Sequence, residues 1–204
     1  MNRRILDMLN PRTLVAAYCR GVFPMVERDE LYWFSPDPRG LLPMDGSLHV
    51  PRRLGRTIRS GRFVCTVDRC FGRVVRRCAR RPDGGETWIS PEVVVAYTTL
   101  HEMGLAHSFE AWEAGAEGEG EPAGGLYGVA LGGAFFGESM FTRVTDAGKV
   151  ALVTGLEHLR RGGFALFDIQ WTTPHLERFG AFDVPRSRYL TMLARALRLR
   201  PRPL

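Results

Sequence analysis

Three polar side chains in two otherwise apolar stretches are the residues of this chain best suited to chemistry. Glu138 stands in a run of phenylalanine, glycine and methionine, and Asp168 and Gln170 stand two positions apart in the run Phe-Asp-Ile-Gln-Trp. A carboxylate in such a run must find a partner or face a cleft, because burial of an unpaired charge is costly. Strand side chains alternate between two faces, so Asp168 and Gln170 are expected to share one face. Two carboxylates and an amide beside an apolar surface form either a catalytic site or a buried hairpin whose polar residues pair only for structure.

These side chains need a hairpin and a further strand to position them. The pair Gly132–Gly133 lies between two apolar runs and is expected to form a two-residue turn in which both glycines have positive φ. Apolar periodicity, capping residues and prolines predict the other elements. The predicted helices cover about 10–21, 51–60, 71–78, 90–104, 146–163 and 185–197, and the predicted strands cover 62–67, 106–113, 124–131, 134–141 and 165–171.

The intervening segments are predicted as turns and loops. Residues 21–25 form a turn, the aromatic group 32–34 closes on the prolines Pro36 and Pro38, and the glycine- and glutamate-rich stretch 114–123 is a loop. Asp146 is expected to cap its helix, and the basic tail 198–204 is expected to be frayed. Because strands and helices mix without a regular βαβ repeat, we predict the α+β class.

Positive charge is concentrated in one part of the chain. The 204 residues carry 28 Lys and Arg against 22 Asp and Glu, yet between Arg52 and Arg81 there are 11 arginines and one acid, Asp68. A patch of one sign this dense suggests a polyanion such as a nucleic acid. We expect the two helices of this segment to form one basic surface that follows phosphates. The candidate phosphate contacts are Arg52, Arg53, Arg56, Arg73, Arg76, Arg77 and Arg80.

Several functional classes lack support in the sequence. No apolar run is long enough to span a membrane, and residues 1–5 do not resemble a signal peptide, so a cytoplasmic protein is expected. The four cysteines have no metal-site spacing and are interpreted as small buried thiols. His101-Glu102-Met103-Gly104-Leu105 lacks the second histidine of a zinc protease, so no metal is expected. Residues 143–149 lack both a P-loop and a coenzyme A loop, and the Glu138-Ser139 region lacks the final glycine of a nucleophile elbow.

Seven short motifs, in order along the chain from about residue 11 to about residue 190, resemble the leucyl/phenylalanyl-tRNA–protein transferase family. They are Tyr18-Cys19-Arg20-Gly21-Val22-Phe23-Pro24, Trp33-Phe34-Ser35-Pro36-Asp37-Pro38-Arg39, Thr87-Trp88-Ile89, His101-Glu102-Met103-Gly104-Leu105-Ala106-His107-Ser108, Gly125-Leu126-Tyr127-Gly128-Val129, Phe136-Gly137-Glu138-Ser139-Met140-Phe141 and Asp168-Ile169-Gln170.

The resemblance implies both an architecture and an activity. It implies a small N-terminal domain over residues 1–38 and an acetyltransferase-like (GNAT-like) catalytic domain over 39–204. The family moves Leu or Phe from aminoacyl-tRNA onto proteins with N-terminal Arg or Lys, which marks these acceptor proteins for degradation. The resemblance further implies an enzyme that uses no cofactor, coenzyme A or metal. The sequence is silent on oligomeric state, so a monomer is the default expectation, and no membrane partner is expected.

The resemblance also assigns residues to three parts of a site. Asp168 and Gln170 match the family's catalytic pair, and Glu138 matches the acid of its Gly-Glu-Ser motif. Two departures are a methionine, Met25, where the family usually has tryptophan, and a shorter stretch before the first helix. The implied pocket for the Leu or Phe side chain consists of Leu126, Phe135, Met140, Leu152 and Phe167, and the implied adenosine and ester region consists of Tyr18, Trp88 and Tyr97.

The chemistry implied by the resemblance is aminolysis of an ester that is already activated, so neither ATP nor a metal is required. The enzyme aligns the acceptor's α-amine with the ester carbonyl and stabilises the oxyanion. A neutral amide is too weak a base for the amine proton, so we interpret Gln170 as an orienting group polarised by Asp168. The proton then passes through the vicinal ribose hydroxyl or water. Glu138 or Asp168 is a candidate to attract the acceptor's cationic residue.

Two other functions remain open from the sequence. The arginine-rich segment favours an RNA-binding module without catalysis, and the implied fold favours a coenzyme-A-dependent acetyltransferase.

Overall fold

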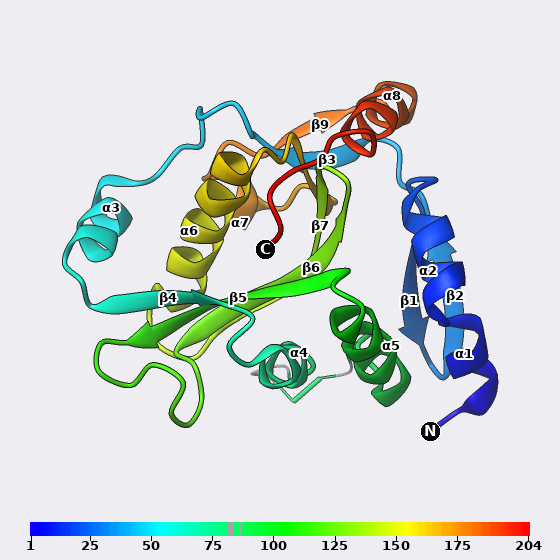
Figure 1. The fold of residues 1–204 in the computed structure, drawn as a ribbon, viewed down its shortest axis with the longest axis horizontal. Coiled ribbons are helices and arrows are strands. Elements are labelled where there is room, and N and C mark those ends of the chain that lie inside the picture. Colours follow the sequence, from blue (N-terminus) through cyan, green and yellow to red (C-terminus); the bar gives the residue numbers. More distant parts are fainter. Residues whose placement is uncertain (81–83, 86) are drawn as a thin grey trace.

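A sheet of seven strands forms the centre of the molecule (Figure 1). The computed structural model describes every residue except 81–83 and 86, so Arg81 lies outside the described residues. The strand order is β4-β5-β6-β7-β8-β3-β9, and all neighbours are antiparallel except the parallel pair β7 and β8. The strands are β3 (Arg39–Leu42), β4 (Phe63–Val67), β5 (Ala106–Glu113), β6 (Gly124–Leu131), β7 (Ala134–Thr142), β8 (Leu166–Gln170) and β9 (Phe182–Val184). This mainly antiparallel sheet with flanking helices confirms the predicted α+β class.

The N-terminal segment packs against the sheet through two helices and a separate hairpin. The helices are α1 (Arg3–Met8) and α2 (Pro11–Tyr18), and the hairpin consists of β1 (Phe23–Glu27) and β2 (Glu30–Phe34). The prediction of a turn over 21–25 was therefore wrong. Cross-strand pairs such as Phe23 with Phe34 hold these residues in a strand. The glycine and proline near Pro24 are typical of a turn, so the local sequence did not predict this pairing.

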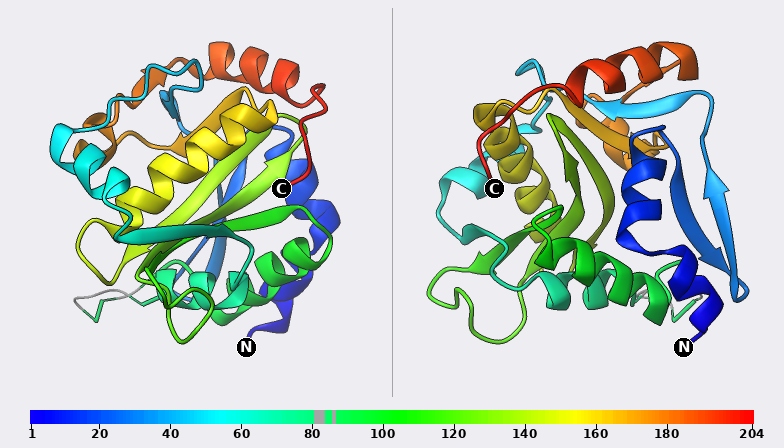
Figure 2. Two further views of the ribbon diagram at one scale, coloured as in Figure 1. Left: turned by 60° about the vertical axis from the view of Figure 1, so that its left-hand side comes forward. Right: turned by 45° about the vertical axis from the view of Figure 1, so that its right-hand side comes forward.

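Helices cover the two faces of the sheet (Figure 2, right). Each face has its own apolar cluster. α6 packs on one face together with α3, whose Leu54 joins that cluster. α4 and α5 pack on the other face with α1 and α2, through residues such as Val74 and Val93. The expectation that the two arginine-rich helices form one surface was therefore wrong, because α3 and α4 lie on opposite faces. The remaining helices have the bounds α3 (Arg52–Arg59), α4 (Phe71–Cys78), α5 (Pro91–Glu102), α6 (Ala147–Gly162), α7 (Pro174–Glu177) and α8 (Arg186–Ala196).

The glycine pair between β6 and β7 forms the predicted hairpin turn. Only Gly132 has positive φ, +54°, so the expectation for both glycines holds for the first alone. A turn with positive φ at its first central position also matches the strand twist. A Cβ on Gly132 would lie 2.5 Å from the carbonyl oxygen of Leu197, so close packing against the end of α8 also requires glycine here.

Two predictions about chain ends and caps were wrong. Asp146 occupies the N-cap position of α6 with φ +72°, but its carboxylate accepts from Lys149 and Arg53 instead of capping the helix. The C-terminal tail is docked rather than frayed, because the backbone N–H of Arg202 donates to the Gly162 carbonyl at 2.9 Å. Leu204 also packs against the α6-side cluster.

The cysteines follow the prediction only in part. Cys70 and Cys78 are buried, whereas Cys19 and Cys65 are exposed. No group of three or more His, Cys, Asp or Glu within the described part of the chain is arranged to hold a metal ion. No helix in that part is long and apolar enough to cross a membrane.

Candidate active site

Asp168 lies fully buried in β8, at the centre of a dense set of hydrogen bonds. Arg39 of β3 donates through Nε to Oδ1 at 2.9 Å and through a terminal nitrogen to Oδ2 at 2.7 Å. The Tyr189 hydroxyl donates to Oδ2 at 2.5 Å, and the backbone N–H of Gln170 donates to Oδ1 at 2.9 Å. Burial raises the pKa of Tyr189 far above its usual range, so the phenol remains a donor. A bidentate guanidinium and two further donors therefore compensate the charge of Asp168.

Arg39 is the last residue of the motif Trp33–Arg39, and no role for it was predicted from the sequence. Its guanidinium carbon lies 4.9 Å from the Phe23 ring centre and 4.5 Å from the Tyr189 ring centre. Its remaining terminal nitrogen donates to the Gly21 carbonyl at 3.0 Å. Arginine is almost never fully buried without a partner, so an isolated arginine before Gly-Leu-Leu is the signal that could have indicated a buried carboxylate partner.

Gln170 stands in a strained turn at the end of β8. Its φ is +60°, and the N–H of Trp171 donates to the carbonyl of Ile169 at 2.7 Å, which closes a γ-turn. Such a turn is rare for a residue other than glycine and marks a position that the surrounding structure enforces. The side chain is buried, and its Nε2 has no hydrogen-bond partner among the described residues. A buried donor without an acceptor is costly, so this amide is the group in the site most in need of a ligand.

Glu138 of β7 is half-buried and has a different environment. Tyr18 of α2 donates to Oε1 at 2.7 Å, Tyr97 of α5 donates to Oε2 at 3.1 Å, and the two phenols bond each other. Burial, opposed by the hydrogen bonds from the two phenols and assisted by the charge of Asp168, raises the pKa of Glu138 to about 7. No guanidinium donates to this carboxylate among the described contacts, so its charge is less well compensated than that of Asp168.

An open cleft of about 1210 Å³ is lined by the residues that follow Glu138 in β7, from Ser139 to Thr142, but not by Glu138, Asp168 or Gln170 themselves. The residues that line the cleft include Met25 and Glu27 of β1, Met140 of β7, and Trp88. The cleft is basic, because its wall includes Arg28, Arg77, Arg80 and Arg143. Of the three residues assigned to the adenosine region, Trp88 lines the cleft, whereas Tyr18 and Tyr97 are fully buried around Glu138.

The five residues assigned to the side-chain pocket gather in the α6-side apolar cluster. The rings of Phe135 and Phe167 have their centres 5.1 Å apart, and Met140 reaches from this cluster to the cleft. The pocket residues are therefore neighbours in space, and all but Met140 are buried; the set is Leu126, Phe135, Met140, Leu152 and Phe167.

The arginines assigned to RNA phosphates divide into two groups. Arg73 and Arg77 of α4 contact the loop 114–123, where Arg77 pairs with Glu121 at 2.7 Å and Arg73 donates to the Gly118 carbonyl at 3.5 Å. Arg77 and Arg80 line the cleft, and Arg76 is exposed on the same helix. Arg52, Arg53 and Arg56 are exposed on α3, on the other face of the sheet.

Comparison with solved structures finds two matches of low identity and low TM-score. L-PGS from Bacillus licheniformis is 12% identical with a TM-score of 0.44, covering 93% of this chain and 77% of that chain. The C-terminal DUF2156 domain of a putative lysylphosphatidylglycerol synthetase from Agrobacterium fabrum is 10% identical with a TM-score of 0.43, covering 84% of this chain and 56% of that chain.

Comparison of sequences gives much closer matches. The family model described as leucyl/phenylalanyl-tRNA protein transferase matches residues 41–194, and the model of that family's N-terminal domain matches 7–37. Proteins named leucyl/phenylalanyl-tRNA–protein transferase are 53% identical in Anaeromyxobacter dehalogenans strain 2CP-C, 50% in Salinibacter ruber and 48% in Herpetosiphon aurantiacus. These matches cover 93%, 96% and 93% of this chain and 80%, 83% and 95% of the relatives. The chain is thus an aminoacyltransferase. It belongs to the leucyl/phenylalanyl-tRNA–protein transferase family.

Proposed function

We propose that this protein transfers Leu or Phe from aminoacyl-tRNA to the N-terminal Arg or Lys of acceptor proteins and so marks them for degradation. The observation that carries the proposal is the unpartnered, buried amide of Gln170 in a site with two carboxylates. The charge of Asp168 is paired with Arg39, whereas Glu138 receives hydrogen bonds from phenols. Because aminoacyl-tRNA is the donor, we place the reaction in the cytoplasm, and we take the monomer as the active form. We also propose residues 1–38 as the small N-terminal domain and 39–204 as the acetyltransferase-like domain.

Gln170 is suited to hold both reacting groups. Its Nε2 is free to donate to the ester carbonyl oxygen, which becomes the oxyanion, and its Oε1 can accept from the attacking amine. Asp168 accepts from the backbone N–H of Gln170 and so fixes the backbone at this residue, not its side-chain amide, and Arg39 in turn fixes Asp168. Asp168 therefore acts as a positioning residue, and its compensated, fully buried charge does not suit it to attract the acceptor's cation.

Glu138 is suited to accept the amine proton. A general base works best when its pKa lies near the operating pH, and burial places the pKa of Glu138 at about 7. As the amine nitrogen bonds to the carbonyl carbon, its proton passes to Glu138. The ester C–O bond then breaks, and the proton goes to the departing ribose oxygen. The products are an amide and a tRNA with a free hydroxyl, and Glu138 is again ionised.

The cleft supplies the donor's binding site in this proposal. Arg77, Arg80 and Arg143 are placed to contact phosphates of the RNA 3′ end, and Trp88 offers an aromatic face to the terminal adenine. Met25 lies in the same cleft but offers no flat platform. The donor's Leu or Phe side chain enters the apolar cluster at Met140, which requires rearrangement of the buried members.

A transfer assay tests this function against both alternatives. Leu-tRNA carrying labelled Leu is incubated with two versions of one protein that differ only in N-terminal Arg or N-terminal Met. We expect label on the Arg version alone. Tight tRNA binding without any transfer would instead support an RNA-binding module, and acetylation of the Arg version from acetyl-coenzyme A would support an acetyltransferase.

A further inference from the structure

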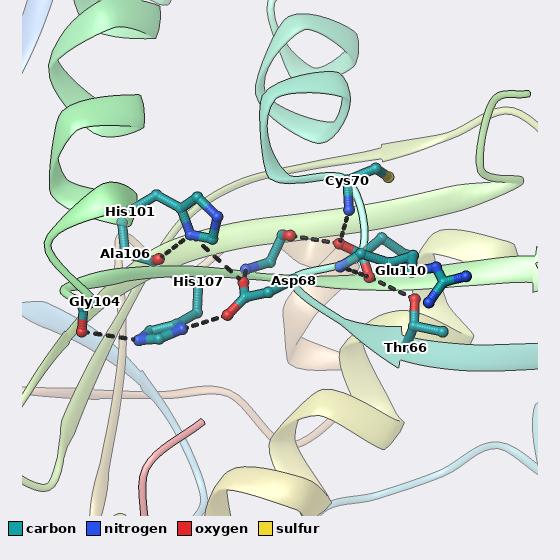
Figure 3. Close-up of polar contacts among 10 residues, drawn as sticks. Thr66, Asp68, Cys70, His101, Gly104, Ala106, His107 and Glu110 are labelled. Carbon is teal, nitrogen blue, oxygen red and sulfur yellow. Dashed lines mark hydrogen bonds and ion pairs between the residues drawn. The ribbon is translucent and has the colours of Figure 1, made fainter. Parts of the chain in front are cut away.

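A second polar cluster, at the start of α4, lies outside the catalytic site (Figure 3). Its centre is Glu110 of β5, which is fully buried. The hydroxyls of Thr66 and Ser108 donate to its carboxylate at 2.6 and 2.5 Å. The backbone N–H groups of Arg69 and Cys70 point to the same carboxylate at 3.4 Å. Four donors surround this charge, and no cationic side chain pairs with it among the described residues.

The surroundings of Glu110 match an ionised carboxylate. The Thr66 oxygen accepts from the Trp112 indole at 2.8 Å, so its own proton is free for Glu110. All four neighbours donate to the carboxylate in this structure, and an ionised carboxylate can accept from all four at once. Burial raises the pKa of Glu110 above its usual range, and the bonds from Ser108 and Thr66 oppose that rise. The cluster is thus arranged around a negative charge.

The helix that begins beside this charge lacks a cap of its own. α4 begins at Phe71, its N-cap Cys70 makes no side-chain hydrogen bond, and its first turn has no acidic residue. A helix N-terminus has N–H groups without partners and carries partial positive charge, so it requires an acceptor and favours an anion. From β5, Glu110 places a negative charge beside this terminus and accepts from the N–H of the N-cap residue Cys70.

The same cluster also reaches the first arginine of α4. The guanidinium carbon of Arg73 lies 5.8 Å from the ring centre of Trp112, and Trp112 is bonded through Thr66 to Glu110. One turn further along α4, Arg77 lines the cleft, and so does Arg80, which follows the C-terminal end of the helix. The direction and position of α4 therefore decide where these guanidinium groups stand.

The connection before α4 is fixed separately by Asp68. Its carboxylate accepts from the Ser108 N–H at 2.8 Å and bonds His107 at 2.7 Å, and His107 also contacts the Gly104 carbonyl at the end of α5 (Figure 3). These contacts do not involve Glu110. Loss of the Glu110 charge should therefore loosen the start of α4 while the preceding connection stays in place.

We propose that Glu110 is a positioning residue for the RNA part of the donor: it caps α4 from β5 and so holds Arg77 of α4, and Arg80 just after the helix, at the cleft. It does not touch the substrate. This inference rests on the proposed function, because it assigns those arginines to donor phosphates.

The test compares two donors on Glu110→Gln, with Glu102→Gln, an exposed acid at the end of α5, as the matched control. Full-length Leu-tRNA uses the arginines, whereas leucyl-adenosine has no phosphate. For Glu110→Gln we expect KM for Leu-tRNA to rise about fivefold to tenfold, about 1–1.4 kcal/mol of binding free energy, because the guanidinium groups are no longer held at the cleft. KM for leucyl-adenosine, and kcat with either donor, should stay at the wild-type level.

A rescue variant separates capping from a general structural role. Cys70→Ser places an N-cap side chain on α4 itself, and in the Glu110→Gln background it should restore most of the tRNA affinity. Ser108→Ala removes one of the four donors and should act in the same direction with a smaller effect, which keeps the test open if Glu110→Gln folds poorly. Equal KM changes for both donors, no change for tRNA, or absence of rescue would each overturn the proposal. Absence of transfer by the wild type from either donor would instead contradict the proposed function itself.

Discussion

The two carboxylates of the catalytic site differ in how the fold treats their charge. Asp168 is fully buried and receives a bidentate guanidinium, a phenol and a backbone N–H. Glu138 is half-buried and receives two phenols. The first arrangement holds a permanent charge in one place, whereas the second leaves a group whose proton can come and go near neutral pH. Two acids on neighbouring strands therefore suit two different tasks.

The largest effect should follow from loss of the Arg39 charge. Arg39→Met leaves Asp168 buried without its cation, which typically costs about 3–5 kcal/mol in the free energy of unfolding. We expect this loss in denaturant unfolding, together with loss of transfer. Adding Asp168→Asn should recover part of the stability but not the activity. If Arg39→Met unfolds like the wild type, the charge of Asp168 is compensated in another way.

Removal of the other charge should affect catalysis without weakening the fold. Glu138→Gln is expected to lower the transfer rate by about 10²- to 10⁴-fold, the usual contribution of a general base, with tRNA affinity unchanged. Burial raises the folded-state pKa of Glu138 to about 7 from 4.5. The protonated form is thus favoured by folding, and its stabilisation is present below pH 4.5 and lost as pH rises through 7. The variant should therefore be more stable than the wild type at pH 8 in the same unfolding measurement, and a marked loss of stability there would contradict this view.

A smaller effect should distinguish the phenols of the two carboxylates. The Tyr18 hydroxyl helps to hold the pKa of Glu138 down, so Tyr18→Phe should move the acidic limb of the pH–rate profile to higher pH. Tyr189→Phe removes a phenol from Asp168 instead and should leave that limb in place. The same shift in both variants would remove the distinction between the two carboxylates.

The sequence predicted the strand positions of the reacting residues well. Gly132–Gly133 between apolar runs indicated the hairpin that carries Glu138, and alternation placed Asp168 on the face away from Phe167, in accord with their different surroundings. Local patterns suffice for these features because turn chemistry and strand period are properties of neighbouring residues.

Features that depend on contacts between residues far apart in the chain could not be predicted from the sequence. The bidentate Arg39–Asp168 pair joins residues 129 positions apart, and the division of the basic helices α3 and α4 between two faces depends on how the sheet is ordered. The same limit applies to the Glu110 cap of α4, because its acceptor comes from another strand. Tertiary packing determines all three features, and neither the periodicity nor the composition of the sequence predicts that packing.

The most direct test of the account is the pH dependence of single-turnover transfer in the wild type and in Glu138→Gln. The acceptor's α-amine titrates with an ordinary pKa near 7.7–8.0 in both reactions. Dividing the wild-type rate by the Glu138→Gln rate at each pH therefore removes the effect of the amine. We predict that this ratio is constant above pH 7 and falls about tenfold per pH unit below it, because only the wild type has a base to lose. A ratio that is independent of pH would contradict the assignment of the proton to Glu138.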